Sequence, residues 1–84
     1  MGKFVHGDLV TIDYEGAEPL WSQLAAILRA DISSGTYPSG RPLPSETTLT
    51  QRYGLARGTV RHAIDSLVTD GLVRRVQGRG TFVV

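Results

Sequence analysis

The fold is decided by residues 45–71, SETTLTQRYGLARGTVRHAIDSLVTDG. Residues 45–54 predict a short helix that is stopped by Gly54, and residues 55–71 predict a second helix. Two helices joined by such a short glycine-containing turn are typical of a helix-turn-helix, whose second helix can enter the major groove of DNA. The sequence therefore predicts DNA binding.

Each of the two helices has an apolar side and a recognisable start. Ser45 offers its hydroxyl as an N-cap, and Glu46 complements the positive end of the first helix. The apolar positions expected to face the core are Leu49, Tyr53 and Leu55, followed by Val60, Ala63, Ile64 and Leu67 in the second helix.

The start of the second helix breaks the usual rules. Ala56 is a poor N-cap, Arg57 opposes the helix dipole, and Gly58 lowers helix propensity. Such violations are expected where function demands them. A phosphate at this end would accept the free backbone N–H groups and pair with Arg57, so the violations favour an anion site here.

A basic hairpin follows. Residues 72–76 and 81–84 predict two strands, and Gln77-Gly78-Arg79-Gly80 predicts the turn, with glycines able to adopt positive φ. A hairpin after a helix-turn-helix is called a wing. Arg79, between two glycines, can reach a groove or a phosphate unobstructed, and because strand residues alternate, only one of Arg74 and Arg75 is expected to face DNA.

The first half of the chain predicts one more helix. Apolar residues recur at helical spacing from Leu20, and Gly35 is a plausible stop. Trp21 is interpreted as a core anchor rather than a ligand contact. Residues 36–44 form a proline-glycine loop, in which Leu43 is the candidate for a single bridge of an edge strand, and residues 9–14 fit a short strand or an extended arm equally well.

Charge is divided unevenly along the chain. Before Arg41 two basic residues face five acidic ones, a net charge of −3, whereas from Arg41 onward seven arginines face three acidic residues, a net charge of +4. This asymmetry indicates an anionic partner for the second half. Arginine suits bidentate contacts to phosphate or guanine.

Composition argues against other classes of protein. The 84 residues suit one small domain, and the absence of cysteine excludes disulfides and thiolate metal sites. The short apolar runs predict no membrane span, so a cytoplasmic protein is expected. The two histidines, His6 and His62, are not spaced as metal ligands, so no metal site is expected. No oxyanion loop accompanies His62, Asp65 and Ser66, so catalysis is not expected. No cofactor is expected either.

Six segments in order carry a family resemblance. They are PLWSQL at 19–24, GTYPSG at 35–40, LPSE at 43–46, RGTVR at 57–61, DGLV at 70–73 and QGRGTFV at 77–83. In their order and spacing, the chain resembles the GntR family of bacterial transcription regulators. The resemblance implies a winged helix-turn-helix over residues 19–84, preceded by an N-terminal arm or short strand over residues 1–18.

The resemblance also implies a mode of binding. A homodimer would read an inverted-repeat operator in double-stranded DNA, with Arg57, Thr59 and Arg61 at bases or phosphates and the wing tip in the minor groove. The residues expected to contact DNA are Ser45, Thr47, Arg57, Gly58, Thr59, Arg61, His62, Arg75, Gln77, Gly78, Arg79 and Gly80.

Three departures from the family pattern matter. Thr47 stands where the family usually has arginine, which removes one cationic contact, and Ala56 replaces the usual serine cap. Family members generally continue into a C-terminal domain that binds a small molecule and dimerises, so no effector site is expected within this chain.

The function expected is sequence-specific DNA binding in transcription regulation, as a repressor. The alternative is a winged-helix protein-interaction module without DNA specificity. In that case the arginines would be ordinary solvated charges, for example Arg61 paired with Asp65 four residues later. Single-stranded RNA binding is disfavoured because no exposed aromatic platform is evident.

Overall fold

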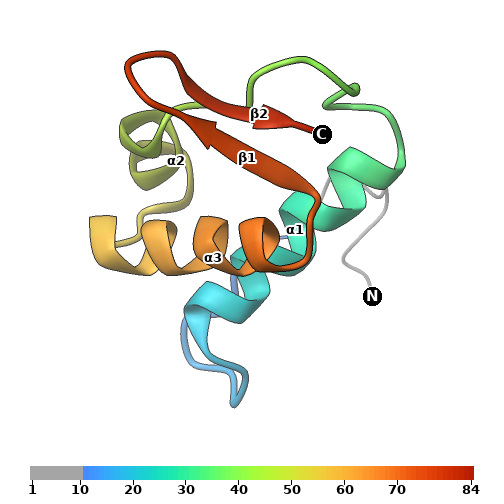
Figure 1. The fold of residues 1–84 in the computed structure, drawn as a ribbon. Helices are drawn as coiled ribbons and strands as arrows, with labels where there is room; N and C mark the ends of the chain where they lie inside the picture. Colours follow the sequence, from blue (N-terminus) through green and yellow to red (C-terminus); the bar gives the residue numbers. More distant parts are fainter. Residues whose placement is uncertain (1–10) are drawn as a thin grey trace.

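Three helices and one hairpin make up the part of the chain that the structure describes. The computed structural model describes residues 11–84, and Figure 1 shows its elements in space. They are α1 (Leu20–Ser33), α2 (Glu46–Tyr53), α3 (Arg57–Thr69), β1 (Val73–Val76) and β2 (Gly80–Val83). The fold is thus the predicted winged helix-turn-helix.

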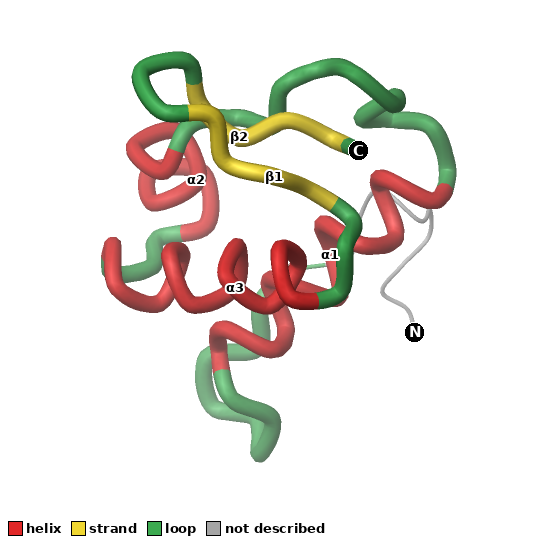
Figure 2. The backbone as a smooth tube through the Cα atoms, viewed as in Figure 1, coloured by secondary structure: helices red, strands yellow, loops and turns green. Residues whose placement is uncertain are grey.

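The core lies where α3 meets the other elements. α1 and α2 both pack against α3, and β1 packs against α3 from the side of the hairpin, which lies over the helical layer (Figure 2). The largest fully buried side chains are Leu24, Leu28, Leu49, Val60, Ile64, Leu67 and Val73. The predicted apolar stripe of α3 is therefore confirmed, and it fixes which face of this helix points outward.

The turn between α2 and α3 forms as the sequence indicates. The Ser45 hydroxyl caps α2 by accepting a hydrogen bond from the backbone N–H of Thr48 at 3.0 Å. α2 ends at Tyr53 and is followed by Gly54, whose φ of 65° is left-handed and so favours glycine. No side chain of the described residues caps α3 at Ala56. The chain consequently enters α3 after a tight turn, and no described side chain caps the first N–H groups of this helix.

α1 ends near the predicted stop, and Trp21 lies at its other end. The helix finishes at Ser33, and Gly35 follows with a φ of 86°. Trp21 is half-buried against the core, which confirms it as a packing residue. Its indole ring also stacks on the imidazole ring of His62, with centroids 4.1 Å apart and planes 16° apart. This stack joins the start of α1 to α3.

The loop before α2 adds a short third strand-like segment to the hairpin. The predicted bridge at Leu43 is wrong by one residue, since Pro42 faces Phe82. The Leu43 N–H donates to the Thr81 carbonyl at 2.8 Å, and the Val83 N–H donates to the Arg41 carbonyl at 2.9 Å. Pro42 has no N–H to donate, so it takes the non-hydrogen-bonded position between these two bonds.

The segment before α1 is held by the Gln23 side chain, by a hydrogen bond from the Tyr14 hydroxyl to the Tyr53 carbonyl and by burial of Ile12. The Gln23 side chain accepts from the Asp13 N–H at 2.7 Å and donates to the Asp13 carbonyl at 2.9 Å. Ile12 is buried in the core. Residues 11–13 of the expected strand or arm are in neither helix nor strand, and residues 9 and 10 lie outside the described residues. The boundary at residue 18 stays a prediction.

Residues 11–84 include no helix with the length and apolarity needed to cross a bilayer.

Replacing Leu67 with alanine should lower the free energy of unfolding by about 2–5 kcal/mol, because the side chain is fully buried and its loss leaves a cavity. Val68→Ala is the matched control: its side chain is 36% exposed, so a change within about 0.5 kcal/mol is expected. Urea unfolding followed by circular dichroism measures both. Equal losses of unfolding free energy in the two variants would contradict the packing of α3 with Leu67 in the core and Val68 at the surface.

Candidate nucleic-acid interface

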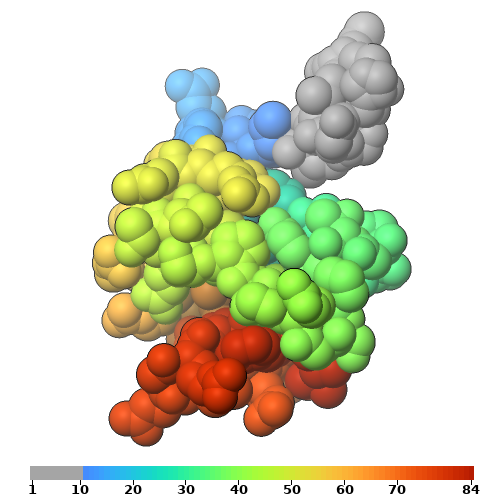
Figure 3. Space-filling model, turned by 90° about the horizontal axis from the view of Figure 1, so that it is seen from above, coloured from blue at the N-terminus to red at the C-terminus, as the bar shows by residue number. Residues whose placement is uncertain are grey.

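A groove of about 510 Å³ runs between the start of α2, the start of α3 and the wing. Segments more than 30 residues apart in the sequence meet in it. Figure 3 shows the wing, the loop before α2 and α2 side by side on one face. The predicted DNA-contacting residues that line the groove are Ser45, Thr47, Arg57, Arg75, Gln77, Gly78, Arg79 and Gly80.

One carboxylate holds both arginines at the start of α3. Glu46 accepts hydrogen bonds from Arg61 Nε and Nη2 at 3.3 and 3.1 Å. A second ion pair joins Glu46 to Arg57 Nη1 at 3.6 Å. The hydrogen bonds from Arg61 lower the pKa of Glu46 from its ordinary value of 4.5, against the opposing effect of partial burial. Glu46 is thus ionised at neutral pH and orients two guanidinium groups.

Asp65, the partner of Arg61 in the alternative of ordinary solvated charges, forms its ion pair with Arg75, and Arg61 pairs with Glu46. Arg75 Nη1 lies 2.5 Å from Asp65 Oδ1, and Arg75 Nη2 donates to the Arg61 carbonyl at 3.5 Å. The bidentate hydrogen bonds to Glu46 form a stronger ion pair for Arg61 than a helical neighbour four residues away would provide. The Arg75 contacts join β1 to α3, so they fix the side chain on the inner side of the wing.

The first turn of α3 is open to an anion. Its leading N–H groups have no intrahelical partner, and no described side chain caps them. Gly58 has open space where a Cβ would stand, and Arg57 donates to the Thr47 hydroxyl at 3.3 Å. The Thr47 hydroxyl therefore helps to position the guanidinium group of Arg57.

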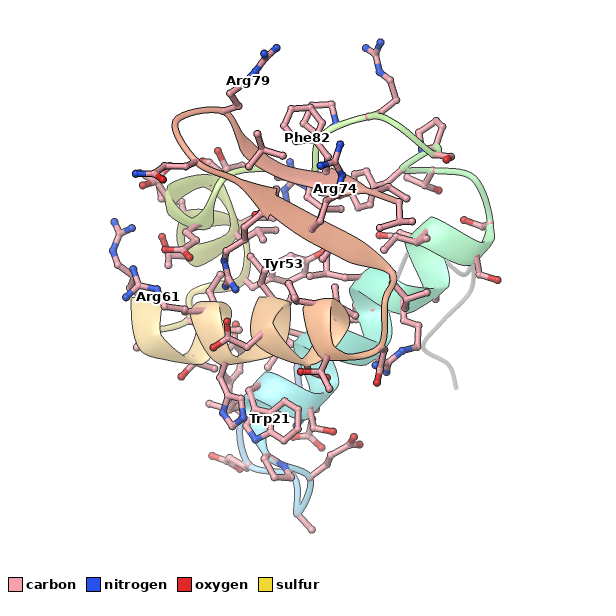
Figure 4. The ribbon with its side chains drawn as sticks, viewed as in Figure 1. Trp21, Tyr53, Arg61, Arg74, Arg79 and Phe82 are labelled. Atoms are coloured by element: carbon pink, nitrogen blue, oxygen red, sulfur yellow. The ribbon has the colours of Figure 1, made fainter. Side chains whose placement is uncertain are left out.

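The wing tip projects away from the helices. The Arg79 side chain points outward from the turn (Figure 4), and the backbone N–H of Arg79 donates to the Val76 carbonyl at 2.9 Å. Gly78 and Gly80 have φ of 76° and 114°. A side chain at either position would be strained, so the glycines on both sides of Arg79 are needed for this turn.

The remaining predicted residues lie outside the lining of the groove. Arg61 and Gly58 are exposed near the start of α3, and Thr59 is half-buried there. His62 is occupied by the stack on Trp21, which lies at the end of the molecule away from the wing (Figure 4). A DNA contact by His62 therefore stays a prediction and is the least supported of the set.

The sequence reasoning missed the roles of Glu46 and Asp65. Local sequence rules give Glu46 a role only at the helix dipole, and the arginines that it holds are 11 and 15 positions away in the sequence. No periodic pattern connects such positions. The arginine-rich second half could have suggested that its few acidic residues serve as partners for the basic ones.

The family is decided by the match of the sequence. A family model described as "Bacterial regulatory proteins, gntR family" matches residues 20–83. This chain belongs to that family. An uncharacterized HTH-type transcriptional regulator of Rhizobium meliloti (strain 1021) is 47% identical over 64 residues, which cover 76% of this chain and 26% of that protein.

A second relative and two solved structures agree. The HTH-type transcriptional repressor NagR of Bacillus subtilis is 38% identical over 88% of this chain and 30% of NagR. The AraR DNA-binding domain in complex with operator ORX1 has a TM-score of 0.82 at 32% identity, covering 89% of this chain and 96% of that one. YtrA from Sulfolobus acidocaldarius, a GntR-family transcription factor, has a TM-score of 0.80 at 32% identity, covering 89% and 79%.

These matches confirm the gntR family and the winged helix-turn-helix. The function of this family is sequence-specific DNA binding in transcription regulation, as the sequence predicts. Its members are transcription regulators, which are not enzymes. The chain spans about a quarter to a third of the length of the curated relatives it matches.

Replacing Glu46 with glutamine should make the free energy of unfolding depend less on pH in the acidic range. Because the pKa of Glu46 is lower in the folded state than in the unfolded state, its stabilisation is complete above the unfolded pKa and is lost as pH falls through the folded pKa. The parent should therefore lose more free energy of unfolding than Glu46→Gln between about pH 5 and pH 3.

The measurement is urea unfolding across that pH range. Glu15→Gln removes one carboxyl from the exposed segment before α1 and serves as the control. If Glu46→Gln and Glu15→Gln gave the same pH dependence, Glu46 would not be the acid-sensitive partner of the α3 arginines.

Proposed function

We propose that this chain represses transcription by binding an operator in duplex DNA, with α3 in the major groove and the wing in the adjacent minor groove. The observation that carries the proposal is the groove in which the start of α2, the start of α3 and the wing tip bring Arg57, Arg75 and Arg79 together. Arg61 lies beside it through its bonds to Glu46. A positive surface at a helix start suits a polyanion.

In this arrangement α3 reads base edges. The major groove is about 12 Å wide and admits a helix, and arginine donates to both acceptors of guanine. Arg57 and Arg61 are suited to this role because their side chains remain 55% and 57% exposed while paired with Glu46. The shared carboxylate holds them in place before DNA arrives, so less side-chain freedom is lost on binding.

The relatives support the regulatory outcome. NagR is named a repressor, and the AraR domain was solved with an operator. We propose that two copies of this chain bind an inverted repeat, one copy to each half-site, since a two-fold symmetric dimer matches a palindromic operator. A bacterial regulator of this kind acts where the chromosome lies, in the cytoplasm. We assign no effector site to the residues of this chain.

Replacing Arg57 with alanine should weaken operator binding by about 1–3 kcal/mol and relax specificity at one base position, because a bidentate base contact is lost. Replacing Arg79 should weaken binding without unfolding the domain, since the wing tip is exposed. The operator is obtained by selecting bound duplexes from a random library, and affinity is then measured by fluorescence anisotropy over a range of salt.

Arg52→Ala is the matched control. Arg52 is exposed on α2, bonds to the Tyr37 hydroxyl and lies outside the lining of the groove, so its loss should leave operator affinity near that of the parent. If Arg57→Ala and Arg79→Ala both bound the operator like the parent, the binding face would be wrong. If the parent protein did not bind random duplex DNA at moderate salt, that result would favour a protein-interaction module instead.

A further inference from the structure

The wing has a second basic face, which the function described so far does not use. Arg74 and Phe82 face each other across the hairpin and lie on the side away from α3 (Figure 4). We define the outer wing face as the surface around a hollow of about 290 Å³ lined by Gly40, Arg74, Val76, Arg79 and Phe82. Adjacent strand residues point to opposite sides, so Arg75 faces α3 and Arg74 faces outward.

The positive charge of the outer wing face is not neutralised within the described residues. Residues 36–45 and 71–84 contain no aspartate or glutamate. The ion pairs of residues 11–84 involve Arg29, Arg57, Arg61 and Arg75, and neither Arg74 nor Arg79 takes part in one. Arg41 is a third exposed cation beside this face, because its carbonyl accepts from the Val83 N–H in β2.

The outer wing face is continuous with the DNA-binding groove. Arg79 lines both the groove and the hollow, so the basic surface passes around the wing tip from one face to the other. A minor groove is only about 6 Å wide, and a wing tip placed in it has a phosphate backbone on each side. The inner face of the wing would meet the backbone nearer α3, and the outer face would meet the other.

We propose that the outer wing face binds the DNA backbone on the far side of the minor groove, beyond the base pairs that α3 reads. Arg74 is the principal donor to phosphate, with Arg79 and Arg41 beside it. Phe82 and Val76 supply an apolar surface between the cations that suits the edge of a deoxyribose. This inference rests on the proposed function and extends the footprint of each copy past its half-site.

The experiment compares two duplexes for each protein. One is trimmed to the base pairs specified by selection from a random library, and the other carries the same core extended on each side by about ten base pairs, one helical turn, of unselected sequence. The parent should bind the extended duplex more tightly. Arg74→Ala should weaken binding to the extended duplex by about fivefold, leave the trimmed duplex unchanged and reduce the salt slope by about one.

Two further variants separate charge from packing. Arg74→Lys keeps the charge and should keep most of the preference for the extended duplex, whereas Arg74→Gln removes the charge, keeps much of the length and should lose the preference. Arg52→Ala, which removes a positive charge from α2, should keep it. Thermal unfolding of each variant by circular dichroism confirms that the domain is folded.

The outcomes distinguish this inference from the function on which it rests. A parent protein that selects no duplex overturns the proposed function itself. A parent that binds both duplexes equally, or an Arg74→Ala variant that weakens both or neither, overturns the role of the outer wing face while operator binding stands. If Arg74→Ala left the binding of both duplexes unchanged, the partner expected for the outer wing face would instead be an acidic protein segment.

Discussion

The burial of one face of α3 is the constraint on which the rest of the structure depends. Val60, Ala63, Ile64 and Leu67 are all buried on that face, between α1, α2 and β1. The opposite face and the first turn are therefore exposed. Because Gly54 turns the chain just before α3 and buried Val73 begins β1 just after it, the wing has little freedom to lie anywhere else.

The charges of the second half are arranged around this helix. Each of its three carboxylates, on Glu46, Asp65 and Asp70, holds at least one arginine. Exposed ion pairs of this kind stabilise a fold by at most about 1 kcal/mol, so their larger effect is on orientation. The arginines near α3 are held in fixed directions, whereas those on the outer side of the wing remain without a carboxylate among the described residues.

The sequence predicts those parts of the structure that depend on local chemistry. The helical spacing of Val60, Ile64 and Leu67 identifies α3, and Ser45 and Gly54 mark the ends of α2 through capping and positive φ. The glycines of the wing tip identify its turn in the same way. Local rules also reveal the uncapped start of α3, because the absence of a capping side chain is visible in the sequence itself.

Contacts between distant segments could not be predicted in this way. The bonds from Glu46 to Arg61, from Asp65 to Arg75 and the stack of Trp21 on His62 exist only once the helices have packed. The bridge at Pro42 depends on which N–H groups and carbonyls of β2 and the loop before α2 face each other. For the candidate interface, the sequence thus indicates which residues can meet DNA, and the fold decides how they are oriented and which side of the wing each occupies.

The start of α3 connects stability to binding. A helix without a capping side chain loses about 1 kcal/mol relative to one with a serine cap, and Arg57 adds a cation at the positive end of the helix dipole. Glu46 offsets that cation, since its carboxylate lies 3.6 Å from Arg57, but it leaves the N–H groups of the first turn without acceptors. A DNA phosphate at this position would accept from those groups and pair with Arg57. The features that weaken the free helix would then become binding contacts, which gives a physical reason for alanine rather than serine at position 56.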